Sequence, residues 1–327
     1  MNQENVKRQL EQGIPSEQPA NQPATRPYFG QFVFVDGLRL HYVSKGAGRP
    51  VVFIHGNPGS HQDFSRTLLG DVSESYRAVA FDRPGHGHSE RFEGTRVTVE
   101  AQARLLRNAL KKLSIERPSI VGHSWGGAVA LAMALEAQED VAGLVLLAPA
   151  AYPGDKAQWW TVLPHVPLLG NFLLQTLTPL LGRWIVRSSL KQAYHPQPIQ
   201  EDYAREAEAL WTRLPQIKAC ANDDRSLDDS LKFLSERYPE LDLPVIIVTG
   251  DSDLLVKPEE HACRLHQSIR GSELIRLDGT GHQIPQTRPE SVTEAIEMVS
   301  ASLESEVWES GVKDQDFRLG TTDSRLI

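Results

Sequence analysis

The chain has 327 residues, of which 40% are hydrophobic and 23% charged, a composition typical of a globular protein with one large core or a core and an accessory domain. The formal net charge is −8 at pH 7, and no run of lysine and arginine marks a surface for nucleic acid or an anionic membrane. The two cysteines, Cys220 and Cys263, are too few for a disulfide framework and predict free thiols in a reducing compartment.

The two ends of the chain are polar. Residues 1–27 are rich in Gln, Glu, Asn and Pro and predict a disordered arm. They lack the continuous apolar stretch of a secretory signal, which favours a soluble, cytoplasmic protein. The most apolar region, residues 162–185, is interrupted by prolines and glycines and predicts no membrane span. Residues 305–327 predict a C-terminal tail that is loose at its end.

Short apolar runs recur along the chain and predict β-strands. The first two form a hairpin around Asp36-Gly37, because this dipeptide favours a tight turn. Unbroken runs of Val, Ile and Leu in the others are typical of strands buried on both faces of a parallel sheet. The predicted strands occupy residues 31–35, 38–44, 50–54, 78–81, 119–121, 143–147, 245–249 and 273–277.

Helical patterns lie between these strands, over residues 97–113 and 125–137. The alternation predicts an α/β fold with a doubly wound, mostly parallel sheet and an antiparallel start. Roughly 95 residues separate the sixth strand from the seventh, far more than one crossover helix needs. This spacing predicts a helical cap or lid over 151–240, inserted in a core formed by 28–150 and 241–304.

The segment from Gly122 to Gly126 is a G-x-S-x-G motif between a predicted strand and a predicted helix. In this setting a strained turn holds the serine hydroxyl exposed at the carboxyl end of the sheet. The amide end of the following helix stabilises negative charge formed there. We therefore expect Ser124 to be a nucleophile, whereas the motif without its context would indicate only a glycine-rich turn.

A nucleophilic serine needs a base and an acid that orients the base. His282 follows the last predicted strand, at the sheet edge where open α/β sheets place their sites, and is the expected base. Two acids, Asp251 and Asp253, follow the preceding strand. Asp251 also has an ordinary explanation, as a turn residue that accepts hydrogen bonds from local amides.

An oxyanion hole is expected from two backbone amides, those of Trp125 and Asn57. Trp125 follows the nucleophile, and Asn57 lies in the loop His55-Gly56-Asn57-Pro58-Gly59 after the third predicted strand. The glycines let this loop approach a substrate closely. The His55 side chain is expected to brace the loop by hydrogen bonding.

Taken together, these motifs resemble the α/β-hydrolase fold superfamily over about residues 30–300. The resemblance implies an eight-stranded core, a cap after the sixth strand, and hydrolysis without a cofactor or metal. The family pattern Gly-x-x-Asp with a later Pro favours Asp253 as the acid, and His86 and His88 belong to a turn motif. The motifs are His55 to Pro58, Asp82 to Ser89, Gly122 to Gly126, Gly250 to Asp253, and Gly281-His282.

The residues of these motifs are most similar to those of the haloalkane dehalogenase and epoxide hydrolase branch, which has Asp where this chain has Ser124. An Asp carboxylate attacks saturated carbon and leaves an ester that water cleaves, whereas a serine alkoxide would leave an ether. Serine suits an acyl carbon, because the acyl-enzyme is itself a hydrolysable ester. In dehalogenases, side chains matching Asn57 and Trp125 bind halide; here the backbone amides are expected to matter more, with the side chains lining the pocket.

Carboxylic ester hydrolysis is therefore the first prediction, with a small-molecule ester as the partner and the oligomeric state left open. The same triad serves carbon–carbon bond hydrolases, amidases or aminopeptidases, lactonases and perhydrolases, and a small-molecule receptor can retain it. Apolar residues of the predicted cap favour a hydrophobic acyl or aromatic pocket, with Trp159, Trp160, Leu163 and Phe172 as its candidates.

Overall fold

A computed structural model of the chain describes residues 30–92, 97–154 and 169–318, with the backbone alone for 169–177, 179–180 and 305–318. Its centre is an eight-stranded sheet in the order β1-β2-β4-β3-β5-β6-β7-β8. β1 and β2 form an antiparallel hairpin, β2 pairs antiparallel with β4, and all other neighbours are parallel. The strands are β1 (Gln31–Val35), β2 (Leu38–Lys45), β3 (Pro50–Ile54), β4 (Arg77–Phe81), β5 (Ser119–His123), β6 (Gly143–Leu147), β7 (Val245–Gly250) and β8 (Glu273–Leu277).

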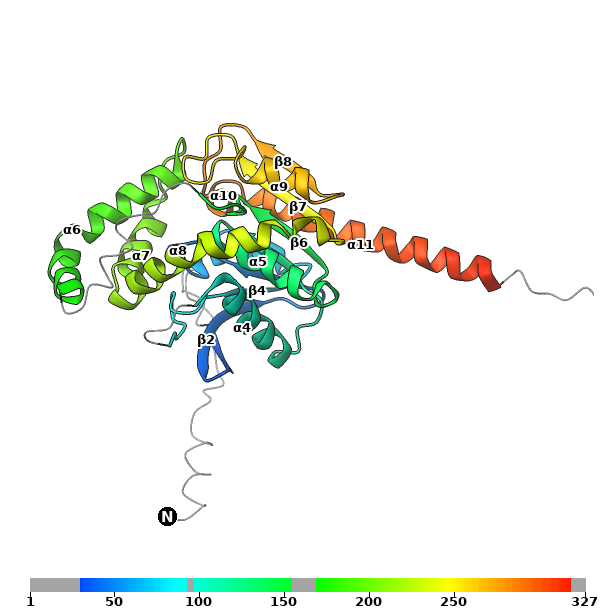
Figure 1. Cartoon of the computed structure of the whole chain (residues 1–327), viewed down its shortest axis with the longest axis horizontal. Helices are drawn as coiled ribbons and strands as arrows, with labels where there is room; N and C mark the ends of the chain where they lie inside the picture. The colour runs from blue at the N-terminus through cyan, green and yellow to red at the C-terminus, as the bar shows by residue number, and fades with distance from the viewer. Residues whose placement is uncertain (1–29, 93–96, 155–168, 319–327) are drawn as a thin grey trace, which may run out of the picture.

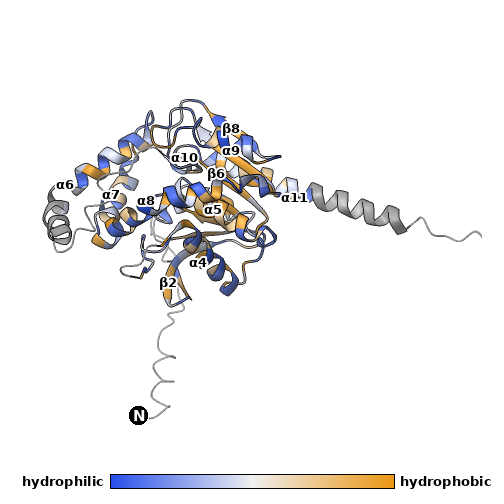
Figure 2. Ribbon diagram, viewed as in Figure 1, coloured by the Kyte–Doolittle hydropathy of each residue, from blue (hydrophilic) through white to orange (hydrophobic). Residues whose placement is uncertain are grey.

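This architecture confirms the predicted α/β fold class and all eight predicted strands, whose ends move by at most two residues. The central strands are buried along almost their whole length, and alternate residues face opposite sides of the sheet. Val52 and Ile54 of β3 pack on one side, and Val51 and Phe53 on the other. Figure 2 shows the apolar residues concentrated on these strands and on α5.

Helices cover both faces of the sheet. The face of Val52 and Ile54 is covered by α4 (Val99–Lys112) and α5 (Trp125–Glu136), and the other face by α3 (Leu69–Val72) and the first half of α11 (Pro289–Arg318). Thr98 caps α4 by accepting a hydrogen bond from the Ala101 amide. The remaining short helices are α2 (Gln62–Ser65), η1 (Gln138–Asp140), α9 (Ala262–Ser268) and α10 (Ile284–Thr287).

Between β6 and β7, residues 169–240 are mainly helical, and we call them the insertion. It contains α6 (Leu169–Tyr194), α7 (Glu201–Trp211), α8 (Leu214–Ser235) and η3 (Tyr238–Glu240). α6 and α7 form their own apolar cluster around Tyr194 and Tyr203 and lie beside the sheet (Figure 1). α8 runs back across the body, and its Leu231 and Leu234 join the main core.

The C-terminal region differs from the predicted tail, because α11 continues as a helix to Arg318. Its first half is anchored against the sheet by Val292, Ile296 and Val299. Once a helix is nucleated in this way, adding further residues is favourable, and the second half extends away from the body (Figure 1). No helix in the described part of the chain is long and apolar enough to cross a bilayer. The predicted N-terminal arm lies outside the described residues.

Candidate active site

Ser124 lies at the turn between β5 and α5, at the carboxyl edge of the central sheet. Its φ of 53° and ψ of −117° form a strained conformation for a residue other than glycine. A Cβ on Gly126 would clash with the carbonyl oxygen of Ile54, and one on Gly122 would lie 2.6 Å from the Gly126 carbonyl oxygen. The two glycines therefore allow the helix, the turn and β3 to approach closely enough to hold the serine in this conformation.

Asp253 and His282 follow the neighbouring strands β7 and β8 and form a direct pair. His282 Nδ1 lies 2.7 Å from Asp253 Oδ2, and both side chains are almost fully buried. Asp253 Oδ1 accepts hydrogen bonds from the amides of Leu255 (2.8 Å) and Val256 (2.9 Å). Burial raises the pKa of Asp253, but His282 and these amides outweigh it, so the pKa lies below its usual value. Asp253 is thus held as a carboxylate against one nitrogen of the imidazole.

Asp251, the competing acid, is exposed and accepts a hydrogen bond from the hydroxyl of its neighbour Ser252 (2.8 Å). Its role is the local one that its position in a turn suggests. The structure therefore brings Asp253, and not Asp251, to His282.

His123 links the turn of Ser124 to the loop of His282, and sequence reasoning did not assign it a role. Its Nε2 donates to the His282 carbonyl oxygen (2.9 Å), and the two rings lie 4.8 Å apart. Burial, followed by the nearby His282, lowers the pKa of His123 to about 3, so the ring is neutral. No hydrogen bond joins Ser124 Oγ to His282 among the described residues. In hydrolases without substrate such contacts are often long and tighten on binding.

The loop after β3 reaches Ser124, since a Cβ on Gly56 would lie 3.1 Å from Ser124 Cβ. His55 braces this loop: its Nδ1 donates to the Gly56 carbonyl oxygen (2.8 Å), and its Nε2 accepts from the Arg83 amide (2.9 Å). Burial lowers the pKa of His55 well below its usual value, which keeps Nε2 free to accept. On the other side of Ser124, Trp125 is the first residue of α5, so its amide has no acceptor within the helix.

The side chains of Asn57 and Trp125 are held by other parts of the protein. Asn57 was expected to line the pocket, but its Nδ2 donates to the carbonyl oxygen of Cys220 (3.1 Å) and to Asp224 Oδ1 (2.6 Å), both on α8. The Arg83 guanidinium lies 4.2 Å from the centre of the Trp125 ring. Through the hydrogen bonds of Asn57 to α8, the insertion contacts the candidate oxyanion loop directly. Burial raises the pKa of the Asp224 carboxyl, one of these acceptors, to about 7.

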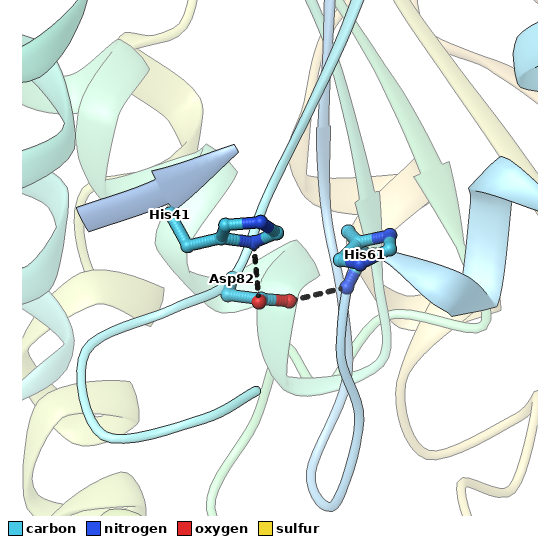
Figure 3. Close-up of side chains that lie close together, drawn as sticks. All are labelled: His41, His61 and Asp82. Atoms are coloured by element: carbon cyan, nitrogen blue, oxygen red, sulfur yellow. Dashed lines mark hydrogen bonds and ion pairs between the residues drawn. The ribbon is translucent and has the colours of Figure 1, made fainter. Parts of the chain in front are cut away.

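Asp82 of the turn motif lies close to two histidines, His41 of β2 and His61 directly before α2 (Figure 3). Asp82 accepts from His41 Nδ1 (2.8 Å), from the His61 amide (2.7 Å) and from the His88 amide (2.9 Å). Burial raises the pKa of Asp82, but these histidines outweigh it and the pKa is lowered. The ligand atoms lie within 4.8 Å of one another, as a metal site would require. However, His41 Nδ1 is bonded to Asp82 and its Nε2 faces the backbone of Gly30, so we assign the cluster to bracing the turn.

The predicted pocket residues of the cap are not placed by the structure. Trp159, Trp160 and Leu163 lie outside the described residues, and Phe172 is described only as part of the α6 backbone. Exposed apolar side chains do occur directly after the acid, where Leu254 is 59% exposed and Leu255 47%.

Comparisons with known proteins agree with this fold. Haloalkane dehalogenase 2 of Mycobacterium bovis is 28% identical over 284 residues, covering 84% of this chain and 96% of that protein. The 2-hydroxy-6-oxo-2,4-heptadienoate hydrolase of Pseudomonas putida is 28% identical over 270 residues, covering 79% and 92%. A thermophilic esterase from Thermogutta terrifontis superposes with a TM-score of 0.70 at 21% identity, covering 84% and 99%. The profile of the Alpha/beta hydrolase family matches residues 51–295, three quarters of the chain. The chain belongs to the Alpha/beta hydrolase family.

Proposed function

We propose that the protein is a serine hydrolase that cleaves carboxylic esters, with Ser124 as the nucleophile, His282 as the base and Asp253 as the orienting acid. The observation that carries the proposal is the strained turn of Ser124 next to a buried, directly bonded Asp253–His282 pair. The three residues come directly after β5 or in the loops after β7 and β8, at the same edge of the sheet.

The reaction follows from these positions. Ser124 Oγ attacks the acyl carbon while His282 Nε2 takes its proton, and Asp253 stabilises the imidazolium through Nδ1. The amides of Asn57 and Trp125 donate to the oxyanion of the tetrahedral intermediate. His282 then returns the proton to the leaving alcohol, and the acyl-enzyme is hydrolysed by water through the same steps. The proposed reaction steps use no cofactor or metal.

A serine at position 124 favours attack on an acyl carbon over attack on the saturated carbon of a haloalkane, the substrate class in the name of the dehalogenase relative. The attack of a serine alkoxide on a haloalkane would form an ether, which the site has no means to hydrolyse. The exposed Leu254 and Leu255 beside Asp253, together with the apolar sequence of the insertion, support a hydrophobic acyl or aromatic group. The similarity to the 2-hydroxy-6-oxo-2,4-heptadienoate hydrolase favours a second candidate, in which the same triad cleaves a carbon–carbon bond in a vinylogous diketone acid.

The test is the hydrolysis of p-nitrophenyl esters of increasing acyl length by the wild type and by Ser124→Ala. We expect the wild type to prefer butyrate or longer acyl groups over acetate, and Ser124→Ala to lose about 10⁴-fold or more in kcat. Ser252→Ala, a nearby serine outside the triad, should retain activity. Turnover that persists in Ser124→Ala would overturn the mechanism, and a clear preference for acetate would overturn the substrate class.

A further inference from the structure

We infer that Arg83 is a positioning residue for the oxyanion hole, and that helix α8 of the insertion holds it in place through Asp223. The inference rests on the proposed ester hydrolysis at Ser124. Arg83 lies in the turn after β4 and is fully buried, so its guanidinium never meets bulk solvent. It contacts the Trp125 ring and the carbonyl oxygen of Gly56, whose peptide bond carries the Asn57 amide.

The first contact sets the direction of the Asn57 amide. Arg83 Nη2 donates to the Gly56 carbonyl oxygen (2.8 Å), and Arg83 Nε donates to the His55 carbonyl oxygen (2.9 Å). The Gly56–Asn57 peptide is trans, since the only cis bonds in the described chain precede Pro58 and Pro196. In a planar trans peptide the C=O and N–H bonds point in opposite directions. Anchoring the Gly56 oxygen on the arginine therefore aims the Asn57 N–H away from it.

The second contact is with Trp125, whose amide is the other proposed donor. The guanidinium carbon lies 4.2 Å from the centre of the Trp125 ring, within the range of a cation–π contact. Trp125 is only 2% exposed, so the stacked pair is shielded from water. One side chain thus restrains both sides of the oxyanion hole, the loop after β3 and the start of α5.

The insertion holds Arg83 itself. Arg83 Nη1 lies 2.6 Å from Asp223 Oδ2 of α8 and also donates to Gln102 Oε1 (2.9 Å) on α4. Asp223 accepts further hydrogen bonds from Arg91, His86 and Gln102, and it is fully buried. Burial raises the pKa of Asp223, but Arg83 and these neighbours outweigh it, so the pKa is lowered and the residue stays a carboxylate.

Three further hydrogen bonds join α8 to the same loop. Gln216 Nε2 donates to the Gly59 carbonyl oxygen (3.0 Å), and Asn57 Nδ2 donates to Cys220 and Asp224. The loop is therefore held both by α8 and by Arg83. Only an arginine supplies the planar set of donors that the four acceptors of Arg83 need, since the single ammonium of lysine has a different geometry. These acceptors are the carbonyl oxygens of His55 and Gly56, Gln102 Oε1 and Asp223 Oδ2.

The experiment compares Arg83→Lys with Arg91→Lys. Arg91 is a matched control because it pairs with the same carboxylate (Nη1 to Asp223 Oδ1, 2.7 Å) but makes no hydrogen bond to residues 55–59 in the described chain. Four quantities are measured: kcat and KM with p-nitrophenyl butyrate, the inhibition constant of phenylboronic acid, and Tm. The boronic acid forms a tetrahedral adduct on the serine and so reports the oxyanion hole.

We expect Arg83→Lys to lower kcat about 10- to 100-fold and to raise the inhibition constant of phenylboronic acid by a similar factor. KM should change little, because the interaction is lost mainly in the transition state. Arg91→Lys should retain both values even if its Tm falls. Should Arg83→Lys not fold, Asp223→Asn gives the same test. It should lower kcat and weaken inhibition by phenylboronic acid together, each by a smaller factor.

The inference is overturned if kcat and the boronic acid constant fall no further in Arg83→Lys than in Arg91→Lys, or if Asp223→Asn leaves both at the wild-type level. These outcomes differ from failure of the proposed function. In that case the wild type itself would not cleave the ester, or Ser124→Ala would still cleave it.

Discussion

At the scale of single residues, the chemistry depends on which oxygen is presented at the strand-to-helix turn and which carboxylate faces the base. Ser124 presents a hydroxyl where the resembling dehalogenases and epoxide hydrolases have a carboxylate, and this directs the proposed reaction to acyl carbon. Asp253 has two backbone amides on one oxygen and His282 on the other. It therefore orients the ring while remaining charged.

Replacing this acid should separate it from its neighbour. We expect Asp253→Asn to lower kcat for p-nitrophenyl butyrate by about 10⁴-fold, because an amide at this position favours the wrong tautomer of His282. Asp251→Asn, the matched control two residues away, changes an exposed side chain that accepts a hydrogen bond from Ser252 and should keep kcat within about twofold of the wild type. A larger loss in Asp251→Asn than in Asp253→Asn would reverse the assignment.

At the scale of elements, the position of Ser124 depends on how closely α5 approaches the sheet. All α5 residues from Trp125 to Leu135 are buried, and the helix begins directly against β3. A side chain at Gly126 would collide with the backbone of Ile54, and backbone atoms cannot move aside as the end of a flexible side chain can. Small residues at this point are therefore a requirement of packing as well as of the turn.

We expect Gly126→Ala to lower the free energy of unfolding by about 1–3 kcal/mol, as overpacking does in tightly packed cores. Ester turnover should fall with it, because α5 can accommodate the methyl group only by moving Ser124. Gly70→Ala is the matched control, since a Cβ there meets no atom within 4 Å. Urea denaturation with a parallel kcat measurement checks both; equal stability of the two variants would contradict the packing argument.

At the scale of the whole molecule, the insertion is joined to the core through buried polar groups as well as through α8. Asp63 of α2 is fully buried and accepts a hydrogen bond from the Tyr203 hydroxyl of α7 (2.8 Å). Burial raises the pKa of this carboxyl to about 7, against the lowering effects of Tyr203 and the nearby Arg83, while Asp82 raises it further. Burial therefore favours the protonated form of Asp63 in the folded state, although the hydrogen bond from Tyr203 favours the carboxylate.

The sign of the pH dependence follows from this shift. Between about pH 4 and pH 7 the folded state holds a proton on Asp63 that the unfolded state has released, so stability falls as pH rises through this window. The loss reaches on the order of 4 kcal/mol above pH 7, at 1.36 kcal/mol for each pKa unit. We expect Asp63→Asn to reduce the slope of unfolding free energy against pH and to be more stable than the wild type at pH 8.

Burial also raises the pKa of Asp224 to about 7. Asp224 should therefore still contribute to the slope of unfolding free energy against pH in Asp63→Asn. Tyr203→Phe retains the buried carboxyl and loses only its donor, so the slope should persist in it. Denaturant titrations from pH 4 to pH 8 measure all three proteins. Identical slopes for the wild type and Asp63→Asn would show that Asp63 is not the group responsible.

The sequence by itself determined the eight strands, the two main core helices and the order of the family motifs. These features are local: the hydrophobic period, the Asp36-Gly37 turn and the glycines around Ser124 are each encoded within a few residues. The roles of Ser124, Asp253 and His282 in catalysis stay predictions, although the structure brings Asp253 to His282.

Only the tertiary structure decided which distant groups meet. The family pattern favoured Asp253 over Asp251, but the hydrogen bond that distinguishes the two acids, with His282 in the loop after β8, is a tertiary contact. Local pattern could not place the Asn57 side chain on α8, or join Arg83 to Asp223 across 140 positions of sequence. Such contacts depend on strand order and helix packing, and burial then makes each charged group require a partner. The position of Ser124 at a strand-to-helix turn was therefore readable from the chain, whereas the residues proposed to position the oxyanion hole were not.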